Sequence, residues 1–430
     1  MTSKDHFIFY GWDTVELARK FGTPLYVLSE TAIKEKCERI REGFLKKYPG
    51  TKAHYASKAF LTLAMCRIMA REGMGLDVVS GGELQMAREA GFPLDKVSLH
   101  GNNKSLSEIE MAMELGVGTI VVDNAMELEV VIQMAEKYDR RQDILLRISP
   151  GIDVKTHKYI STGHAGSKFG LPAFGEEIET VEEIAVSSEL VNLRGYHFHL
   201  GSLLYERESY VMAVDVILDR VSSLKERHGQ IIEEVNIGGG FGIPVMPGDR
   251  SPDITEFTDP VMERVSEKCT ARGLKVPVVS IEPGRWIISQ AGITLYTAGF
   301  MKEIPGLVKY ISVDGGMTDN PRPALYGSKY YAVNAERYGE EKNEKVTIVG
   351  KCCESGDVLV RDIDFPRMKP GEIVAVLNTG AYNFSMASNY NAALRPAVVL
   401  LGDNTAEVIV RRQTYEDILR GQFVPDHLSE

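Results

Sequence analysis

The sequence predicts an α/β chain: a (β/α)8 barrel followed by a mostly antiparallel C-terminal β domain. Three observations predict this fold class. Eight apolar, β-rich runs alternate with helix-like segments between Thr51 and Pro283, further strands follow Gly284 without long helices between them, and polar or glycine residues end nearly all eight runs. Alternating strands and helices favour a parallel barrel, whose chemistry gathers where its strands end, and strands joined by short turns favour antiparallel pairing.

By this pattern the chain has three parts. Residues 1–35 form an N-terminal segment whose run FGTPLYVLS is expected to contribute to the β domain, residues 36–283 form the barrel, and residues 284–430 form the C-terminal β-barrel or sandwich. The barrel strands are expected at AHYAS, GLDVVS, KVSLHG, TIVVD, DILLRIS, NLRGYHFHLGS, EEVNIGGG and VPVVSIEPG. The later strands are expected at GITLYTAGFMKEI, LVKYISVDGG, EKVTIVG, EIVAVLN, RPAVVLLG and AEVIVRRQ.

Composition excludes several classes of function. Hydrophobic residues make up 44% of the 430-residue chain, which is enough for a sizeable core. The net charge of -11 without a basic stripe disfavours nucleic-acid binding, and no apolar run approaches the roughly 20 residues of a membrane helix. The five cysteines show no zinc-type spacing, so we expect no metal site and free thiols, as in a cytoplasmic protein without a signal peptide.

The first strand carries an unexpected lysine. Lys58 lies in the small and aromatic run TKAHYASKAF, and an ammonium group in an apolar setting costs several kcal/mol unless it is paired or neutralised. We therefore expect Lys58 to be buried at the inner end of the strand. Desolvation favours a neutral amine, which can form an imine with a carbonyl compound.

Further polar residues follow the other strands and are expected on the same rim of the barrel. They are Asp77 with SGGE, the run HGNNKS beginning at His100, His197 and His199 with Gly-Ser, the run GGGFG beginning at Gly238, and Glu282 with Arg285. Each has a simpler interpretation: GGGFG as a tight turn, either histidine as a core residue, and Glu282 with Arg285 as a local salt bridge. Together, a glycine loop that can surround a phosphate, a lysine, an imidazole and a carboxylate indicate pyridoxal phosphate.

At this point the sequence resembles the fold-type III, alanine-racemase-like pyridoxal-phosphate decarboxylases, and among them the diaminopimelate decarboxylases. The resemblance covers almost the whole chain and rests on motifs in the family's order: YASKA, GLDVVSGGEL, HGNNKS, THKYISTG, SKFGL, HFHLGS, GGGFGIP, EPGR, RPALYG, CCESGD and GAYNFSMASNYN. It implies pyridoxal 5'-phosphate as cofactor, a homodimer, and decarboxylation of meso-2,6-diaminopimelate to L-lysine and CO2, the last step of lysine biosynthesis.

The resemblance also implies a role for each matching residue. Lys58 would hold the cofactor as a Schiff base, His199 would stack on its ring, and Glu282 would pair with its pyridine nitrogen. The remaining cofactor contacts would come from Asp77, Ser202, Gly238, Gly239, Gly240, Gly284, Arg285 and Tyr382. The substrate would be bound by Arg285, Arg322, Tyr326, Tyr382 and Glu354, and Cys353 would donate the proton, with Cys353 and Glu354 entering from the partner subunit.

Alternative functions stay open at this stage. One is a decarboxylase of the same fold that acts on another amino acid, such as D-ornithine or D-lysine. Another is a non-catalytic homologue that binds pyridoxal phosphate, and a third is an aldolase-type barrel that uses Lys58 without a cofactor. The chain departs from the family's pattern at Phe60, Leu203, Val245 and Lys351, of which Leu203 and Val245 are the ones expected to alter the pocket wall.

Overall fold

A computed structural model describes residues 5–152 and 167–429 of the chain. The THKYISTG motif at 156–163 lies outside the described residues. The chain divides into two compact units, one formed by 34–244 with 248–287 and the other by 1–33, 245–247 and 288–430. We call them the barrel unit and the β unit.

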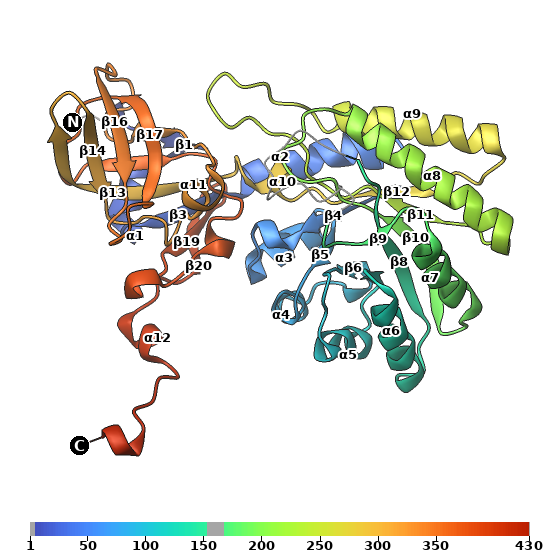
Figure 1. The fold of residues 1–430 in the computed structure, drawn as a ribbon. Helices are drawn as coiled ribbons and strands as arrows, with labels where there is room; N and C mark the ends of the chain where they lie inside the picture. The colour runs from blue at the N-terminus through green and yellow to red at the C-terminus, as the bar shows by residue number, and fades with distance from the viewer. Residues whose placement is uncertain (1–4, 153–166, 430) are drawn as a thin grey trace. The chain divides into compact units, whose positions relative to one another are not determined.

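The barrel unit is a closed ring of eight parallel strands (Figure 1). Each strand pairs with the next, β8 pairs with β10, and β12 pairs with β4 to close the ring. The strands are β4 (Lys52–Ala56), β5 (Gly75–Val78), β6 (Val97–Leu99), β7 (Thr119–Val122), β8 (Gln142–Ser149), β10 (Val191–His197), β11 (Glu234–Asn236) and β12 (Val278–Ile281), with the two-residue β9 (Leu171–Pro172) on β8. All eight expected runs form these strands, so the barrel prediction is confirmed.

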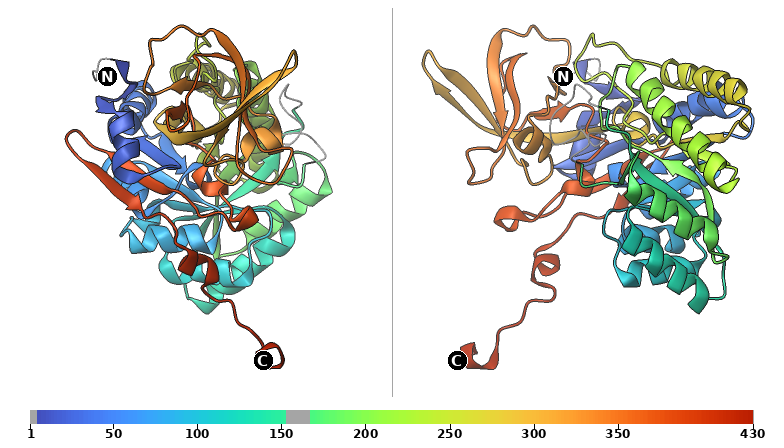
Figure 2. Two further views of the ribbon diagram at one scale, coloured as in Figure 1. Left: turned by 90° about the vertical axis from the view of Figure 1, so that its left-hand side faces the viewer. Right: turned by 45° about the vertical axis from the view of Figure 1, so that its right-hand side comes forward.

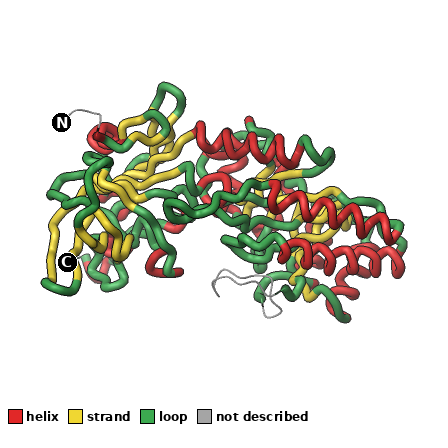
Figure 3. The backbone as a smooth tube through the Cα atoms, turned by 90° about the horizontal axis from the view of Figure 1, so that it is seen from above, coloured by secondary structure: helices red, strands yellow, loops and turns green. Residues whose placement is uncertain are grey.

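Helices surround these strands (Figure 3). They are α2 (Glu30–Ile40), α3 (Leu63–Arg71), α4 (Gly81–Glu89), α5 (Leu106–Leu115), α6 (Ala125–Lys137), α7 (Glu176–Ser187), α8 (Glu208–His228), α9 (Thr255–Arg272) and the short α10 (Arg285–Ile288). Local sequence sets their ends: α5 begins at a capping box between Ser105 and Glu108 and ends at Gly116 with φ +76°. The barrel strands therefore end in loops that lead into well-defined helices.

The β unit is an open sheet in the order β17-β16-β14-β13-β3-β19-β20, with β18 on β13 and β15 on β18. Its pairs are antiparallel except β14 with β16 and β3 with β19. The strands are β3 (Leu25–Ser29), β13 (Gly292–Ile304), β14 (Val308–Val313), β15 (Ala332–Asn334), β16 (Glu344–Val349), β17 (Val358–Phe365), β18 (Ile373–Val376), β19 (Ala397–Leu401) and β20 (Ala406–Val410). The prediction of a separate, mostly antiparallel β domain is confirmed, and the FGTPLYVLS run supplies β3.

Smaller elements complete the β unit. They are the hairpin of β1 (Ile8–Phe9) and β2 (Trp12–Asp13), and the helices α1 (Thr14–Phe21), α11 (Arg322–Tyr326) and α12 (Tyr415–Leu419). After β20 the chain leaves the sheets of its unit and ends in a projecting segment that carries α12 (Figure 2). Among the helices that the structure describes, none has both the length and the apolarity to cross a membrane.

Candidate active site

A cavity of about 390 Å³ opens at the carboxyl ends of the barrel strands. Its volume falls within the range of small-molecule sites. Its ionisable lining residues come from six strand ends or the turns after them: Lys58, Asp77, His100, Lys104, Arg147, His197, His199 and Glu282. Side chains that are far apart in the sequence therefore meet in one place, as the barrel prediction requires.

Lys58 lies at this cavity, but the prediction that it is buried is wrong. Strand β4 ends at Ala56, and Lys58 sits in the following 3₁₀ turn, Ser57–Ala59. The turn carries Lys58 beyond the last residue of the strand. Lys58 is exposed there, whereas its neighbours Ser57 and Ala59 are buried. Phe60 is only 1% exposed and fills the core beside the turn, and its carbonyl accepts a hydrogen bond from the Tyr55 hydroxyl at 2.8 Å. The departure at Phe60 is thus a packing feature.

Glu282 is a buried carboxylate surrounded by donors. Its Oε1 accepts from Asn236 Nδ2 at 2.8 Å and lies 3.1 Å from His100 Nε2, and its Oε2 lies 3.0 Å from His197 Nε2. Burial alone would raise the pKa of Glu282, but the two histidines outweigh burial and hold this pKa well below its usual value. Glu282 is therefore a fixed negative charge at the base of the cavity.

Asp77 lies in the same cavity with the opposite tendency. Its Oδ1 is 3.7 Å from His100 Nε2 and has no hydrogen-bond partner among the described residues. The pKa of Asp77 is raised, chiefly by burial, with His100 opposing the rise and the Glu282 charge adding to it. Two carboxyl groups in one cavity thus favour different protonation states.

His199 follows β10 and is held against the glycine turn. The backbone N–H of Gly239 donates to His199 Nδ1 at 3.3 Å, so a neutral ring carries its proton on Nε2. Burial lowers the pKa of His199 well below its usual value, and the nearby Lys58 and Arg147 lower it further. The ring is therefore uncharged and suited to stacking. Its neighbour His197 is also kept neutral, because burial lowers its pKa to about 4.

The Gly238–Gly240 turn requires its glycines. Gly238 and Gly240 have φ of +67° and +94°, and a side chain at Gly239 or Gly240 would overlap the carbonyl oxygen of Glu282 or Gly201. The Gly238 N–H donates to Asn236 Oδ1 at 2.9 Å. Two of the three glycine N–H groups, those of Gly238 and Gly239, are thus used to shape the turn.

Ser202, Gly284 and Arg285 lie at the neighbouring strand ends of the same unit. Arg285 Nε donates to Ser202 Oγ at 3.2 Å, which joins the loop after β10 to the start of α10. A side chain at Gly284 would come within 2.9 Å of Ala56 Cβ, so this glycine allows the loop after β12 to approach β4. Leu203 adopts φ +60°, a left-handed conformation that costs a leucine roughly 1–2 kcal/mol.

Sequence reasoning assigned no specific role to several residues of this site, among them His100, Arg147 and Asn236. His100 was recognised only as part of a polar strand end, and Asn236 lies within the run EEVNIGGG, where only the glycines were given a role. Arg147 lies within the run DILLRIS, and a charged residue there was the available signal. Its guanidinium stands 4.4 Å from the Phe169 ring, and burial lowers its pKa although Asp123, Glu282 and Asp77 oppose this.

In the β unit, the predicted residues Arg322, Tyr326 and Tyr382 form one cluster. The Arg322 guanidinium carbon lies 4.8 Å from the Tyr326 ring and 5.1 Å from the Tyr382 ring. Arg322 is only 4% exposed, and its Nε has no hydrogen-bond partner among the described residues. A buried guanidinium with an unpaired donor is suited to bind a carboxylate group.

Cys353 and Glu354 occupy the loop between β16 and β17, and both are exposed. The neighbouring Cys352 is half-buried, and its pKa is raised to about 11 by burial and by Asp357. The two adjacent cysteines therefore have different environments. Of the two, Cys353 is the more accessible.

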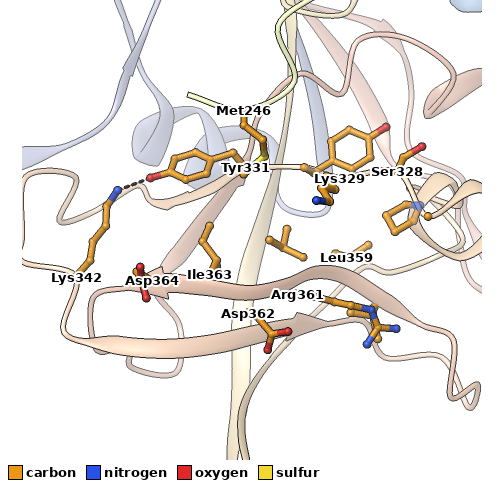
Figure 4. Close-up of a pocket in the computed structure, with 15 residues that line it drawn as sticks. Met246, Ser328, Lys329, Tyr331, Lys342, Leu359, Arg361, Asp362, Ile363 and Asp364 are labelled. Atoms are coloured by element: carbon orange, nitrogen blue, oxygen red, sulfur yellow. Dashed lines mark hydrogen bonds between the residues drawn. The ribbon is translucent and has the colours of Figure 1, made fainter. Parts of the chain in front are cut away.

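A larger cavity of about 710 Å³ lies within the β unit beside β17 (Figure 4). Tyr331 accepts a hydrogen bond there from Lys342 Nζ. The charged residues that line it, Lys329, Lys342, Arg361, Asp362 and Asp364, are all exposed. No buried ionisable pair faces this cavity and none of the predicted site residues lines it among the described residues, so we place the chemistry in the barrel cavity.

Comparisons with known proteins find relatives over most of the chain. Residues 30–289 match the family model "Pyridoxal-dependent decarboxylase, pyridoxal binding domain". The chain is 43% identical over 410 residues to the diaminopimelate decarboxylase of Bacillus subtilis, covering 95% of this chain and 93% of that one. The structure of diaminopimelate decarboxylase from M. jannaschii in complex with L-lysine matches with a TM-score of 0.92 at 36% identity, covering 99% and 98% of the two chains. A lysine/ornithine decarboxylase from Vibrio vulnificus matches with a TM-score of 0.76 at 24% identity, covering 90% and 97%, and is alike in fold alone.

Proposed function

The chain belongs to the diaminopimelate decarboxylases of the pyridoxal-dependent decarboxylase family, and from this premise we propose its reaction. It removes one carboxyl group of meso-2,6-diaminopimelate as CO2 and releases L-lysine, with pyridoxal 5'-phosphate as cofactor. The observation that carries the proposal is the barrel cavity, where the Lys58 amine, the ionised Glu282 and the neutral His199 face one space.

The residues present fit this cofactor. The Lys58 amine would hold its aldehyde carbon covalently, and the Glu282 carboxylate would hold the ring nitrogen protonated. The neutral His199 ring would cover one face, and Asp77 would lie beside the ring nitrogen. Because Gly238 and Gly239 already use their N–H groups, the phosphate would be held mainly by Ser202 and Gly240. Gly284, Arg285 and Tyr382 are the remaining residues that we propose to contact the cofactor. When bound, the cofactor supplies an electron sink for the pair left by the departing CO2.

The substrate has two amino-acid centres, and the chain must distinguish them. We propose, as the family resemblance implies, that Arg322, Tyr326, Tyr382 and Arg285 bind the unreacted carboxylate and that Glu354 binds the unreacted ammonium group; of these, Arg322 lies against the Tyr326 and Tyr382 rings. An amine without the second carboxylate would leave the buried Arg322 guanidinium unpaired, which is costly in a closed site. This selects diaminopimelate over D-ornithine or D-lysine.

The proton that replaces CO2 would come from the Cys353 thiol. We propose that Cys353 and Glu354 act in the partner subunit of a homodimer, because both are exposed in the single chain. The five free cysteines suit a reducing compartment such as the cytoplasm. Leu203 and Val245 remain the proposed places where the pocket wall differs from the family's pattern.

The test combines covalent trapping with turnover. Borohydride reduction followed by peptide mapping should place the reduced cofactor on Lys58, and the purified protein should release CO2 from meso-diaminopimelate. Lys58→Ala should lose both, whereas Lys96→Ala, an exposed lysine of the same unit, should keep both. Label on another lysine would refute the cofactor assignment. Turnover of D-ornithine or D-lysine at the same rate as meso-diaminopimelate would refute the substrate assignment.

A further inference from the structure

The loop that carries Cys353 and Glu354 closes around one buried carboxylate, that of Asp357. Asp357 is 3% exposed. Its Oδ1 accepts from the Met317 backbone N–H at 2.6 Å, and its Oδ2 accepts from the Cys352 backbone N–H at 2.8 Å. Hydrogen bonds to an ionised acceptor are the strong kind. One side chain thus joins the loop to the turn that precedes α11 and Arg322.

Glycines make this arrangement possible. A side chain at Gly316, or at Gly350, would overlap the Asp357 carboxylate, so both backbones lie directly against it. Two further backbone bonds hold the same segments, from Gly350 N–H to Asp357 O and from Lys351 N–H to Gly315 O, each at 3.0 Å. The carboxylate therefore occupies the centre of a tightly packed junction.

A second residue holds the loop from outside. Asn391 Oδ1 accepts from the Cys353 backbone N–H at 3.0 Å, and Asn391 has φ +53°. The consecutive backbone N–H groups of Cys352 and Cys353 thus donate to different partners: that of Cys352 to the Asp357 carboxylate and that of Cys353 to the Asn391 side-chain amide oxygen. This directs Cys352 inward and leaves Cys353 exposed.

We propose that Asp357 and Asn391 are positioning residues that fix the reactive geometry of Cys353 and Glu354. The inference rests on the proposed function, in which those two residues act on the substrate. Neither Asp357 nor Asn391 touches the substrate in this proposal. They act by setting the path of the loop and by tying it to the segment before Arg322.

The first test is Asp357→Asn. The amide turns a donor toward one of the two backbone N–H groups, so the loop must shift. Because displacement of about 1 Å can cost on the order of 100-fold in rate, we expect kcat to fall by about 10- to 100-fold with the cofactor dissociation constant unchanged. Asp364→Asn, which alters an exposed carboxylate on the same β17, is the matched control and should keep wild-type kcat.

Two readouts separate positioning from general destabilisation. In a background that carries both Cys353→Ala and Glu354→Gln, Asp357→Asn should add little further loss of kcat, whereas a merely structural effect would multiply with it. Native alkylation by iodoacetamide with peptide mapping should label Cys353 alone in the wild type and also Cys352 in Asp357→Asn. Asn391→Gly tolerates the positive φ, removes the outer acceptor and serves if Asp357→Asn does not fold.

The outcomes are distinct. Wild-type kcat in both Asp357→Asn and Asn391→Gly would overturn the inference. So would a loss in Asp357→Asn that multiplies with the loss caused by Cys353→Ala and Glu354→Gln together. Unchanged protection of Cys352 in Asp357→Asn would also overturn it, whatever the activity. A wild-type protein that releases no CO2 from meso-diaminopimelate would instead overturn the proposed function, and the alkylation pattern would still decide the role of Asp357.

Discussion

Replacement of His100 tests how the barrel cavity keeps Glu282 ionised. His100 Nε2 lies 3.1 Å from Glu282 Oε1, and Asn236 and His197 are hydrogen-bonded to the same carboxylate. In His100→Leu the buried carboxylate loses one of these partners. A hydrogen bond to a charged group contributes about 1.5–3 kcal/mol. At about 1.4 kcal/mol per factor of ten, kcat should fall roughly 10- to 150-fold if Glu282 must be ionised in the transition state.

The pH dependence follows from the same contact. His100 helps to lower the pKa of Glu282, so its removal raises that pKa. Activity that needs the ionised carboxylate is present above this pKa and is lost as pH falls through it. The acid limb of the kcat profile should therefore move to higher pH in His100→Leu.

The assay is CO2 release from meso-diaminopimelate across pH 5–9, which is about two units on either side of neutrality and spans the range in which histidine titrates. Cofactor binding is measured separately, by spectrophotometric titration of the apoprotein with cofactor. His100→Gln should restore much of the rate, because its amide can donate near the position of Nε2. His228→Asn, at the exposed end of α8, is the control. Near-wild-type kcat in His100→Leu, or no recovery in His100→Gln, would refute this reasoning.

Three further predictions concern other parts of the chain. Arg322→Lys should raise KM for meso-diaminopimelate about 10- to 100-fold and leave cofactor binding unchanged, because an ammonium group cannot reproduce the planar contacts with Tyr326 and Tyr382. An unchanged KM in steady-state assays would contradict this prediction. Glu182→Gln removes the buried ionised partner of Arg220 and leaves it only the exposed Glu179, so it should lower the free energy of unfolding by about 3–5 kcal/mol in denaturant titrations. Glu183→Gln, which alters an exposed carboxylate, should change this free energy little. Burial raises the pKa of Asp319 to about 7, so the free energy of unfolding falls as pH rises from about 4 to 7. The free energy of unfolding of Asp319→Asn should match that of the wild type near pH 4 and exceed it by up to about 4 kcal/mol at pH 8, and equal values at pH 8 would contradict this.

The fold was predictable because its signals are local. Each barrel strand is a short apolar run, and the polar residue that ends it lies on the rim whatever the exact register. Strand β17 was not expected, because the charged residues in VLVRDIDF interrupt its apolar pattern. Its bulged pairing with β16 is a tertiary feature that no periodicity reports.

The candidate site was only partly predictable, for a related reason. Lys58, His199 and Glu282 stand out as unusual residues at strand ends, and all three line the cavity. Their partners His100, Arg147 and Asn236 come from the different strands β6, β8 and β11, and only barrel closure brings all of them together. The exposure of Lys58 was mispredicted because a three-residue turn, and not the strand, carries it.

The opposite tendencies of Asp77 and Glu282 assign their roles. Two adjacent carboxylates in a water-poor cavity would repel each other, and one positive ring nitrogen can compensate only one of them. Glu282 has hydrogen bonds with Asn236 and His197 and a third contact with His100, whereas Asp77 Oδ1 has no hydrogen-bond partner among the described residues, so the charge settles on Glu282. His100 stands between them, 3.1 Å from Glu282 and 3.7 Å from Asp77. Environments that push two pKa values apart separate the permanent anion from the group that can carry a proton. By this argument we propose that Glu282 would fix the charge of the ring nitrogen, whereas Asp77, whose pKa is raised by burial, would be the carboxyl group more ready to carry a proton.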